Sequence, residues 1–311
     1  MTILLATDFA PDALSAWGHA LRALLPQETI VTERAHADPD AIDIALIANP
    51  PAGALADLPK LRLIQSMWAG VDKLLRDPSI PADVPLARMV DPAMNEAMAE
   101  TALWAVLSLH RGFFAYARQQ ADAQWQALPQ RRADELHVAV LGLGQMGATV
   151  ARRLAANGYR VTGWSTRPVV VEGIATVHGD AALIPLLGRH EIVVNLLPLT
   201  ASTTALFDRE RLALLPRGAS LVNLARGAHV VEADLLAALD AGHLQHAVLD
   251  VFATEPLPVE HPFWRHPRVT VLPHAAAQTD LRSATLVAVD NVKRLRSGEP
   301  VAHLVERMRG Y

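Results

Sequence analysis

Three closely spaced glycines are the first residues in this sequence whose type and spacing could do chemistry. Gly142, Gly144 and Gly147 form the pattern G-x-G-x-x-G directly after the apolar run His137–Leu141 and at the start of a helical segment. There the first glycine permits a tight turn, the second lets a pyrophosphate approach the backbone, and the third lets helix and strand pack closely. The pattern favours a dinucleotide; a glycine-rich turn of an ordinary α/β domain and a methyl-donor cofactor site are the alternatives. The expected cofactor contacts are Gly142, Gly144, Gln145, Met146 and Gly147.

The segment that ends the next strand distinguishes NAD from NADP. An acidic residue about 20 positions after the first glycine would accept the ribose 2′-hydroxyl of NAD. This chain instead has Ser165, Thr166 and Arg167, with no carboxylate in the segment GWSTRP. Two hydroxyls and a guanidinium can bind a 2′-phosphate, which an acid would repel. The segment therefore predicts NADP(H) in preference to NAD(H), unless Arg167 simply lies on a solvated loop.

Parallel sheets are the elements that must position these residues. Short β-rich apolar runs alternate along the chain with segments of helical period, and one such helix begins at Pro11-Asp12 and closes before Pro26. This alternation is typical of parallel sheets covered by helices on both faces. The predicted strands are Ile3–Ala6, Ile44–Ala48, Arg62–Gln65, Leu86–Val90, His137–Leu141, Arg160–Trp164, Ile192–Leu196, Ser220–Leu224, Ala247–Val251 and Val269–Val271.

The helical segments between the two halves set the expected domain boundaries. A long helix is predicted from about Asn95 to about Arg118, followed by the Gln-rich stretch Gln119–Arg132, which fits neither period and could be an arm. The last helix, about Thr279–Arg296, is expected to pack back on the first half. We therefore predict one domain from residues 1–98 plus 280–311 and a dinucleotide-binding domain from residues 99–279.

Composition excludes several classes of function. The 311 residues are enough for about two domains, and 28 basic against 32 acidic residues give a net charge of −4, unsuited to nucleic acid. The absence of cysteine excludes disulfides, thiolate catalysis and cysteine metal sites, and no metal site is predicted. None of the three lysines follows a glycine, so a P-loop is excluded. The first residues lack a basic n-region and the apolar stretch Ala102–Leu109 is too short to span a bilayer, so we expect a cytoplasmic protein without a membrane partner.

Four further segments carry a resemblance to a known family. They are SMWAGVDKLL at 66–75, NLARGAHVVEADLLAAL at 223–239, LDVFATEPLP at 249–258 and VLPHAAAQT at 271–279. With the glycine fingerprint, they resemble the D-isomer-specific 2-hydroxyacid dehydrogenase family, and most closely its short glyoxylate/hydroxypyruvate reductase branch of the A type. The resemblance covers nearly the whole chain and implies an α/β fold of two doubly wound parallel-sheet domains, a Rossmann cofactor domain and a flavodoxin-like substrate domain.

The resemblance implies a catalytic group of Arg226, Glu255 and His274. Reduction of a 2-oxoacid moves a hydride to the carbonyl carbon while the carbonyl oxygen gains a proton. His274 would donate that proton, Glu255 would favour the protonated ring and fix it, and Arg226 would hold the substrate carboxylate with its planar fork. Taken singly, a residue of each of these types is more often a surface, loop or packing residue; the three motifs in order and spacing carry the assignment.

The resemblance also implies contacts to cofactor and substrate. Asp250 would meet the nicotinamide carboxamide, although it could instead cap a helix, and Leu197, Pro198 and Ala225 would line the cofactor site. The segment Asn195-Leu196-Leu197 departs from many relatives, which have a histidine there. For the substrate, the backbone N–H groups of the Trp68-Ala69-Gly70 loop would bind the carboxylate, and Trp68 would either cap a small pocket or be a core residue. The contacts named for the substrate are Trp68, Ala69, Gly70, Arg226 and His274.

The expected function is therefore NADPH-dependent reduction of small 2-oxoacids, glyoxylate to glycolate and hydroxypyruvate to D-glycerate. Another D-2-hydroxyacid dehydrogenase, with a 2-ketogluconate or phenylpyruvate type of substrate, is one alternative. An NAD(P)H-sensing binding protein of the same fold is another, although a sensor need not keep Arg226, Glu255 and His274 together. The family pattern also predicts a homodimer formed through the nucleotide domain, the long helix and the Gln119–Arg132 arm.

Overall fold

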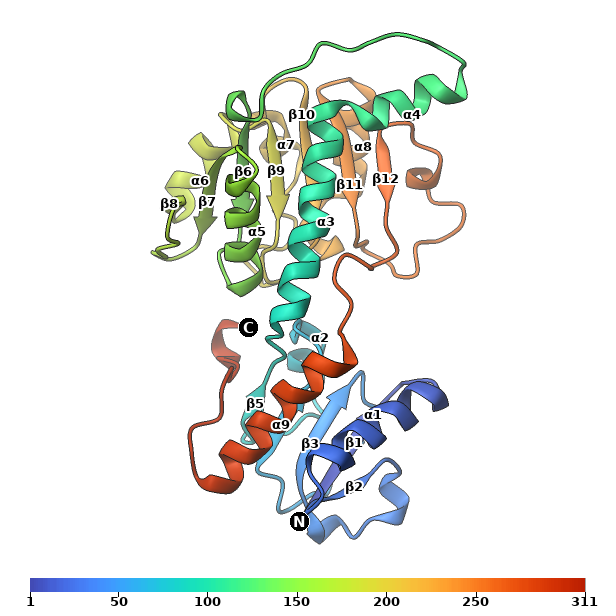
Figure 1. The fold of residues 1–311 in the computed structure, drawn as a ribbon, viewed down its shortest axis with the longest axis vertical. Helices are drawn as coiled ribbons and strands as arrows, with labels where there is room; N and C mark the ends of the chain where they lie inside the picture. The colour runs from blue at the N-terminus through green and yellow to red at the C-terminus, as the bar shows by residue number, and fades with distance from the viewer. Residues whose placement is uncertain (311) are drawn as a thin grey trace. The chain divides into compact units, whose positions relative to one another are not determined.

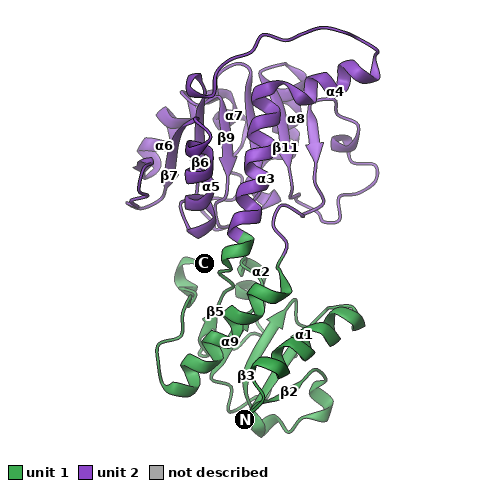
Figure 2. Cartoon of the chain, viewed as in Figure 1, with its two compact units in different colours: residues 1–94, 279–311 green, residues 95–278 purple. Residues whose placement is uncertain are grey.

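The computed structural model describes residues 1–310 and divides the chain into two compact units (Figure 2). Unit 1 contains residues 1–94 and the chain from Thr279 onwards, and unit 2 contains residues 95–278. The predicted boundaries, after residues 98 and 279, lie within four residues of these. Among the helices of the described residues, none combines the length and the hydropathy that a bilayer crossing requires.

Unit 1 is built on a five-stranded parallel sheet in the order β2-β1-β3-β4-β5 (Figure 1). This is the flavodoxin-like order of a doubly wound sheet. Helices α1 and α9 cover one face through buried residues such as Trp17, Leu21 and Ala288, and residues 54–61 and α2 cover the other. The elements are β1 (Thr2–Thr7), α1 (Pro11–Leu24), β2 (Thr29–Val31), η1 (Arg34–His36), η2 (Pro39–Ala41), β3 (Ile42–Ala48), β4 (Leu63–Ser66), α2 (Asp72–Arg76), β5 (Leu86–Ala87), α9 (Leu281–Ser297) and η6 (Arg307–Arg309).

Unit 2 holds a seven-stranded parallel sheet in the order β12-β11-β10-β9-β6-β7-β8. The chain starts at β6, runs outward to β8 and returns to β9, so the order reverses between β6 and β9, as in a dinucleotide-binding sheet. Alternate strand residues face opposite ways: Val138 and Val140 pack with α3 and α5, while Ala139 and Leu141 pack with α6, α7 and α8. The elements are α3 (Pro92–Arg111), α4 (Phe113–Ala121), η3 (Ala133–Glu135), β6 (His137–Leu141), α5 (Gln145–Ala156), β7 (Arg160–Ser165), β8 (Ala175–His178), α6 (Asp180–Leu187), β9 (Ile192–Asn195), α7 (Arg209–Leu214), β10 (Ala219–Asn223), η4 (Gly227–His229), α8 (Glu232–Asp240), β11 (Leu244–Leu249), η5 (Pro262–Trp264) and β12 (Val269–Val271).

These two sheets confirm the predicted fold class, but some elements differ from the prediction. The sequence does not predict strands β2 and β8, because each is an edge strand of only three or four residues, most of them at least partly exposed. The last predicted strand of the first half, Leu86–Val90, is only the two residues of β5.

The single long helix predicted from Asn95 to Arg118 is wrong. The helix stops at Arg111 because Gly112 takes a left-handed conformation, with φ of 70°, and α4 begins after it. Contacts with β11 and with the segment before β12 hold α4: the ring of Phe114 stacks on His246 at 4.4 Å, and the guanidinium of Arg118 donates to the Pro267 carbonyl at 3.0 Å. Periodicity alone could not reveal this break, because apolar residues continue at helical spacing through Gly112.

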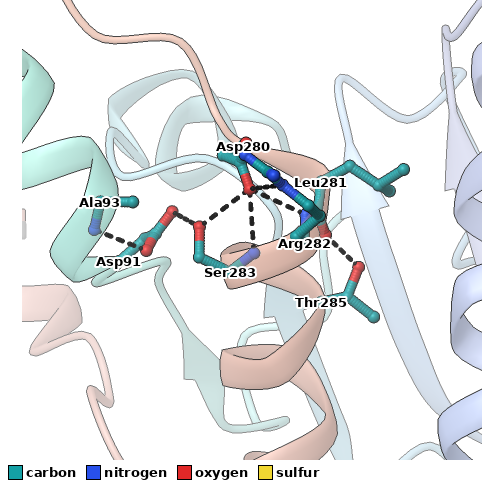
Figure 3. A network of polar contacts seen from close by, with 7 residues as sticks. All are labelled: Asp91, Ala93, Asp280, Leu281, Arg282, Ser283 and Thr285. Carbon is teal, nitrogen blue, oxygen red and sulfur yellow. Dashed lines mark hydrogen bonds and ion pairs between the residues drawn. The ribbon is translucent and has the colours of Figure 1, made fainter.

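Within unit 1, polar side chains tie together the two places where the chain crosses the unit boundary (Figure 3). The hydroxyl of Ser283, in the first turn of α9, donates to a carboxylate oxygen of Asp91 at 2.8 Å, and the other oxygen of Asp91 accepts from the Ala93 N–H at 3.0 Å. Asp280 caps α9 by accepting from the N–H groups of Arg282 and Ser283. The segments before α3 and before α9 are therefore anchored to each other.

Candidate active site

The candidate site residues of unit 2 follow six neighbouring strands at the same edge of the sheet. Going along the sheet from β12 to β6, the loops after the strands carry in turn His274, Asp250 with Glu255, Arg226, Leu197 and the glycine fingerprint. Ser165 ends the next strand, β7, and Thr166 and Arg167 follow it. Parallel strands bring their carboxyl ends to one edge, which is where open α/β sheets bind ligands (Figure 1). The proposed catalytic residues thus follow β10, β11 and β12, whereas the residues proposed for the pyrophosphate and the 2′-phosphate lie at the ends of β6 and β7. The proposed nicotinamide contacts follow β9, β10 and β11.

The glycine loop between β6 and α5 is shaped for a ligand. A Cβ on Gly147 would lie 1.7 Å from the Gly142 carbonyl oxygen, and one on Gly142 would lie 2.7 Å from the Leu196 oxygen, so neither position tolerates a side chain. Gly144, the exposed N-cap of α5, has no atom within 4 Å of such a Cβ, and the first turn of α5 contains no acidic residue. The loop therefore leaves open space beside a helix N-terminus, the arrangement that suits the pyrophosphate of a dinucleotide.

The loop after β7 presents a cation and no acid. The hydroxyl of buried Ser165 donates to the Arg167 carbonyl at 2.5 Å, so it fixes the turn. Thr166 and Arg167 are exposed, and the guanidinium of Arg167 makes no hydrogen bond or ion pair within residues 1–310. Thr166 and Arg167 therefore carry the donors that this loop can offer to a phosphate.

His274 and Glu255 are in direct contact. The Nδ1 atom of His274 lies 2.8 Å from Oε2 of Glu255, while Oε1 of Glu255 accepts from the Phe252 N–H at 3.0 Å. Both side chains are partly exposed, His274 at 52% and Glu255 at 31%. Because Nδ1 faces the carboxylate, the second ring nitrogen, Nε2, is left without a partner among the described residues. An imidazole held in this way can transfer a proton at Nε2.

Asp250 anchors the segment that carries His274. It is almost completely buried, and its carboxylate accepts from the backbone N–H groups of Ala275 and Ala276 at 2.7–3.1 Å. Its carbonyl also accepts the His274 N–H at 2.9 Å, and His274 takes a left-handed backbone conformation with φ of 54°. Burial raises the pKa of Asp250, and the two backbone bonds oppose this rise. This anchoring contact was not foreseen from the sequence, and Asp250 does not cap a helix.

Arg226 is held in a loop that packs tightly against the segment leading to Glu255. Its backbone carbonyl accepts from the Asn223 amide at 3.0 Å, and its guanidinium donates to the Ala225 carbonyl at 2.7 Å. A Cβ on Gly227 would lie only 1.9 Å from the carbonyl carbon of Phe252. The glycine after the arginine is therefore required for these two loops to lie so close.

The remaining predicted residues lie in unit 1, in the loop that follows β4. The Ser66 hydroxyl bonds both the N–H and the carbonyl of Trp68, at 3.1 and 3.0 Å, and the Met89 N–H donates to that same carbonyl at 3.1 Å. The indole of Trp68 is half-buried and meets the ring of Phe9 edge-on at 5.8 Å. The N–H groups of Ala69 and Gly70 donate to no acceptor within the described chain, so they are available to an anion.

Sequence reasoning missed three buried polar residues beneath the site: Asn195, Asn223 and His229, each 0% exposed. Asn195 and Asn223 end the buried, mostly apolar strands β9 and β10 at paired positions. An asparagine at the end of each of two mostly apolar runs, IVVN and SLVN, is a signal that could have identified them. Their contacts connect the loop of Leu197 and Pro198 to the loop of Arg226.

Comparisons with known proteins agree with this geometry. Residues 103–276 match the model of the D-isomer specific 2-hydroxyacid dehydrogenase NAD binding domain. A curated relative named glyoxylate/hydroxypyruvate reductase A, from Serratia proteamaculans, is 39% identical over 300 residues, which cover 95% of this chain and 96% of that protein.

Two solved structures are similar along their whole length. One is a D-isomer specific 2-hydroxyacid dehydrogenase from Xanthobacter autotrophicus Py2 in complex with NADPH and MES, with TM-score 0.94, 42% identity and 99% of each chain covered. The other is an NADPH-dependent glyoxylate/hydroxypyruvate reductase from Sinorhizobium meliloti in complex with NADP and sulfate, with TM-score 0.92, 35% identity and coverage of 100% of this chain and 99% of that one. The resemblance read from the sequence is thereby confirmed, and the chain belongs to the D-isomer specific 2-hydroxyacid dehydrogenase family.

Proposed function

We propose that this protein is an NADPH-dependent reductase of small 2-oxoacids, converting glyoxylate to glycolate and hydroxypyruvate to D-glycerate. The observation that carries the proposal is the His274–Glu255 pair, with Nδ1 of the ring on the carboxylate at 2.8 Å and Nε2 left for a reacting oxygen. A nucleotide-sensing protein has no need of this pair. The names and bound ligands of the relatives support the same activity.

The residues present fit a dinucleotide cofactor. Gly142, Gly144, Gln145, Met146 and Gly147 would hold the pyrophosphate at the N-terminus of α5, where Gly144 leaves open space. Thr166 and Arg167 would bind the 2′-phosphate, on a turn that Ser165 fixes, so that NADP(H) is preferred over NAD(H). Leu197, Pro198, Ala225 and Asp250 would surround the nicotinamide. When bound, the reduced cofactor supplies the hydride that the carbonyl carbon of the substrate receives.

The chain's own residues then bind the acid and supply the proton. Arg226 would hold the substrate carboxylate with two parallel hydrogen bonds and polarise the carbonyl. The backbone N–H groups of Ala69 and Gly70 in unit 1 would serve as further donors to a carboxylate. Nε2 of His274 would donate the proton to the carbonyl oxygen as negative charge develops there. The carboxylate of Glu255, 2.8 Å from Nδ1, keeps the ring oriented.

The two units would divide this work. Unit 2 would be the cofactor domain, and unit 1 the substrate domain that contributes the Trp68-Ala69-Gly70 loop. Trp68, which Phe9 and the backbone bonds of its loop hold in place, would restrict the site to acids of two or three carbons. A cytoplasmic location remains a prediction of the sequence.

A homodimer formed through unit 2 is part of the proposal. Three large apolar side chains on α3, on α4 and in the segment after α4 are exposed: Trp104 at 41%, Phe113 at 53%, and Trp125 completely. An apolar cavity of about 450 Å³ lies between α3 and α4, lined by Leu103, Trp104, Leu107, Phe113 and Phe114 among others. Burial of such a surface against a second copy would stabilise the pair. Light scattering at micromolar concentration should give twice the chain mass; a monomer there would overturn the claim.

Steady oxidation of NADPH at 340 nm with added glyoxylate or hydroxypyruvate tests the enzymatic proposal. We expect turnover with both acids and little with bulkier ones, such as phenylpyruvate or 2-ketogluconate. A protein that binds NADPH but oxidises it with none of these acids would be a sensor rather than a reductase. Efficient turnover confined to a bulky acid would assign the chain to another substrate class of the same family.

A further inference from the structure

Three polar side chains lie in the interior of unit 2, directly beneath the loops of the candidate site. Asn195 at the end of β9, Asn223 at the end of β10 and His229 at the end of η4 are all 0% exposed. The residues before the two asparagines in their strands are buried and mostly apolar. Burying a polar group costs free energy unless it is hydrogen-bonded, so each polar atom of these side chains needs a partner.

The backbone fixes the orientation of both amides. The Leu197 N–H donates to Oδ1 of Asn195 at 3.3 Å, which turns Nδ2 of Asn195 toward the interior. In Asn223, Oδ1 accepts from the Ala225 N–H at 3.3 Å, and Nδ2 donates to the Arg226 carbonyl at 3.0 Å. Each amide is thus bound to the loop that follows its own strand.

The amide nitrogen of Asn195 joins the two loops. It donates to Oδ1 of Asn223 at 2.9 Å and to Nδ1 of His229 at 2.9 Å. Because Nδ1 of His229 accepts in this arrangement, the ring carries its proton on Nε2, which lies 3.3 Å from the Pro198 carbonyl and can donate to it. The donors and acceptors of the three side chains are therefore matched without conflict.

We propose that Asn195, Asn223 and His229 are positioning residues that couple the cofactor loop at Leu197-Pro198 to the loop of Arg226, so that the nicotinamide site and the carboxylate-binding guanidinium keep one fixed geometry. The inference rests on the proposed function, because it takes the two loops as the cofactor and substrate sides of one reaction. The network holds the first loop at the Leu197 N–H and the Pro198 carbonyl, and the second at the Ala225 N–H and the Arg226 carbonyl. A shift of either loop would break bonds that hold the other.

This coupling has a kinetic consequence that a purely structural role does not have. Catalysis requires the reacting groups to be held to within a fraction of an ångström, so a loosened network weakens binding of both ligands and slows the reaction. A substitution that only creates a cavity elsewhere in the same sheet would lower the thermal midpoint but leave the KM values of NADPH and of the acid unchanged. The split between stability and kinetics therefore distinguishes the two roles.

The test compares two variants of His229 with a matched core variant. His229→Phe keeps a planar ring and removes both polar atoms, whereas in His229→Gln the amide oxygen can accept from Asn195 and the amide nitrogen can donate toward Pro198. Val193→Ala is the control, because Val193 is completely buried in β9 two residues before Asn195 and has no polar contact. All three are measured for thermal midpoint, for kcat, and for the KM of NADPH and of glyoxylate.

We expect His229→Phe to lower kcat/KM by about tenfold or more and to raise both KM values, with His229→Gln recovering most of the loss. Val193→Ala should lower the thermal midpoint with both KM values unchanged. If His229→Phe is folded and its kinetic constants match those of the wild type, or if it changes them no more than Val193→Ala does, the positioning role is overturned.

A double variant tests whether the network acts through Arg226. In the Arg226→Lys background the guanidinium is already lost, so His229→Phe should lower kcat/KM by a clearly smaller factor than it does in the wild type. If His229→Phe lowers kcat/KM by the same factor in both backgrounds, the network does not act through Arg226. If the wild type reduces no 2-oxoacid, the proposed function fails; coupling to the cofactor loop is then judged from the NADPH dissociation constant by fluorescence titration, which His229→Phe should raise and Val193→Ala should not.

Discussion

The backbone N–H of His274 donates to the carbonyl oxygen of Asp250 at 2.9 Å, and the carboxylate of Asp250 holds the two residues that follow the histidine. A buried acid at the end of β11 therefore sets the backbone from which the exposed imidazole projects. Glu255, five residues after Asp250, then orients the ring itself through Nδ1. The position and the orientation of the proposed proton donor thus both depend on the chain after β11.

Replacement of His274 should remove the proton transfer but leave the binding of NADPH intact. We expect His274→Ala to lower kcat by about 10² to 10⁴, the usual range for a lost general acid, with the NADPH dissociation constant unchanged. His19→Ala, an exposed histidine on α1, is the control and should retain full activity. A residual kcat within a factor of about three of the wild type would remove His274 from the mechanism.

Loss of the carboxylate should disturb the orientation of the ring. Glu255 accepts from the Phe252 N–H with one oxygen and contacts Nδ1 of His274 with the other. The amide of Glu255→Gln has only one acceptor oxygen, so it cannot keep both contacts in their present form. We expect kcat to fall by about tenfold or more, with the NADPH dissociation constant unchanged. A kcat equal to that of the wild type would show that the pair at 2.8 Å does not position the proton donor.

The cofactor preference should depend on the cation after β7. NADPH brings a phosphate to the loop where Arg167 stands exposed, and charge-assisted hydrogen bonds contribute roughly 1.5–3 kcal/mol, about one to two decades in binding. We expect the wild type to prefer NADPH over NADH by at least about tenfold, mostly in KM, and Arg167→Ala to reduce this preference. Arg160→Ala, at the exposed amino end of the same strand, should leave it intact. Equal efficiency of the wild type with both cofactors would mean that Arg167 points into solvent.

Acid should destabilise the fold partly through His246. Burial, together with Arg118 and other nearby cations, lowers the pKa of His246 to about 3, against about 6.5 in an unfolded chain. Between these values the unfolded chain binds a proton that the folded protein does not, so the free energy of unfolding falls as the pH falls from 6.5 toward 3. At pH 5 this loss is on the order of 2 kcal/mol.

His246→Phe removes the titrating group and can keep the stack on Phe114, although it loses the 2.9 Å bond to the Thr270 hydroxyl. Urea denaturation at pH 7 and pH 5 should therefore show a smaller decrease in unfolding free energy for this variant than for the wild type. An equal decrease in both proteins would contradict the role of His246.

Much of the architecture can be predicted from local sequence. Apolar runs between helical segments predict both parallel sheets, because burial on two faces requires strands with few polar residues. The glycine turn is equally local: a Cβ at Gly142 or Gly147 would collide with backbone a few residues away or in the adjoining strand, so only glycine serves there. Family motifs in the loops after β10, β11 and β12 predict Arg226, Glu255 and His274 as the catalytic group.

Other features depend on which distant segments pack together. The break between α3 and α4 depends on the left-handed turn at Gly112, which lets Phe114 reach His246, 132 positions away in the sequence. The periodicity of apolar residues cannot predict that contact. The Asp250 anchor and the coupling of Asn195 to His229 likewise join residues of different strands and loops. Hydrogen bonds form only where folding brings a donor to an acceptor within about 3 Å, so the sequence by itself determined which groups the protein contains, and the tertiary structure decided which of them meet.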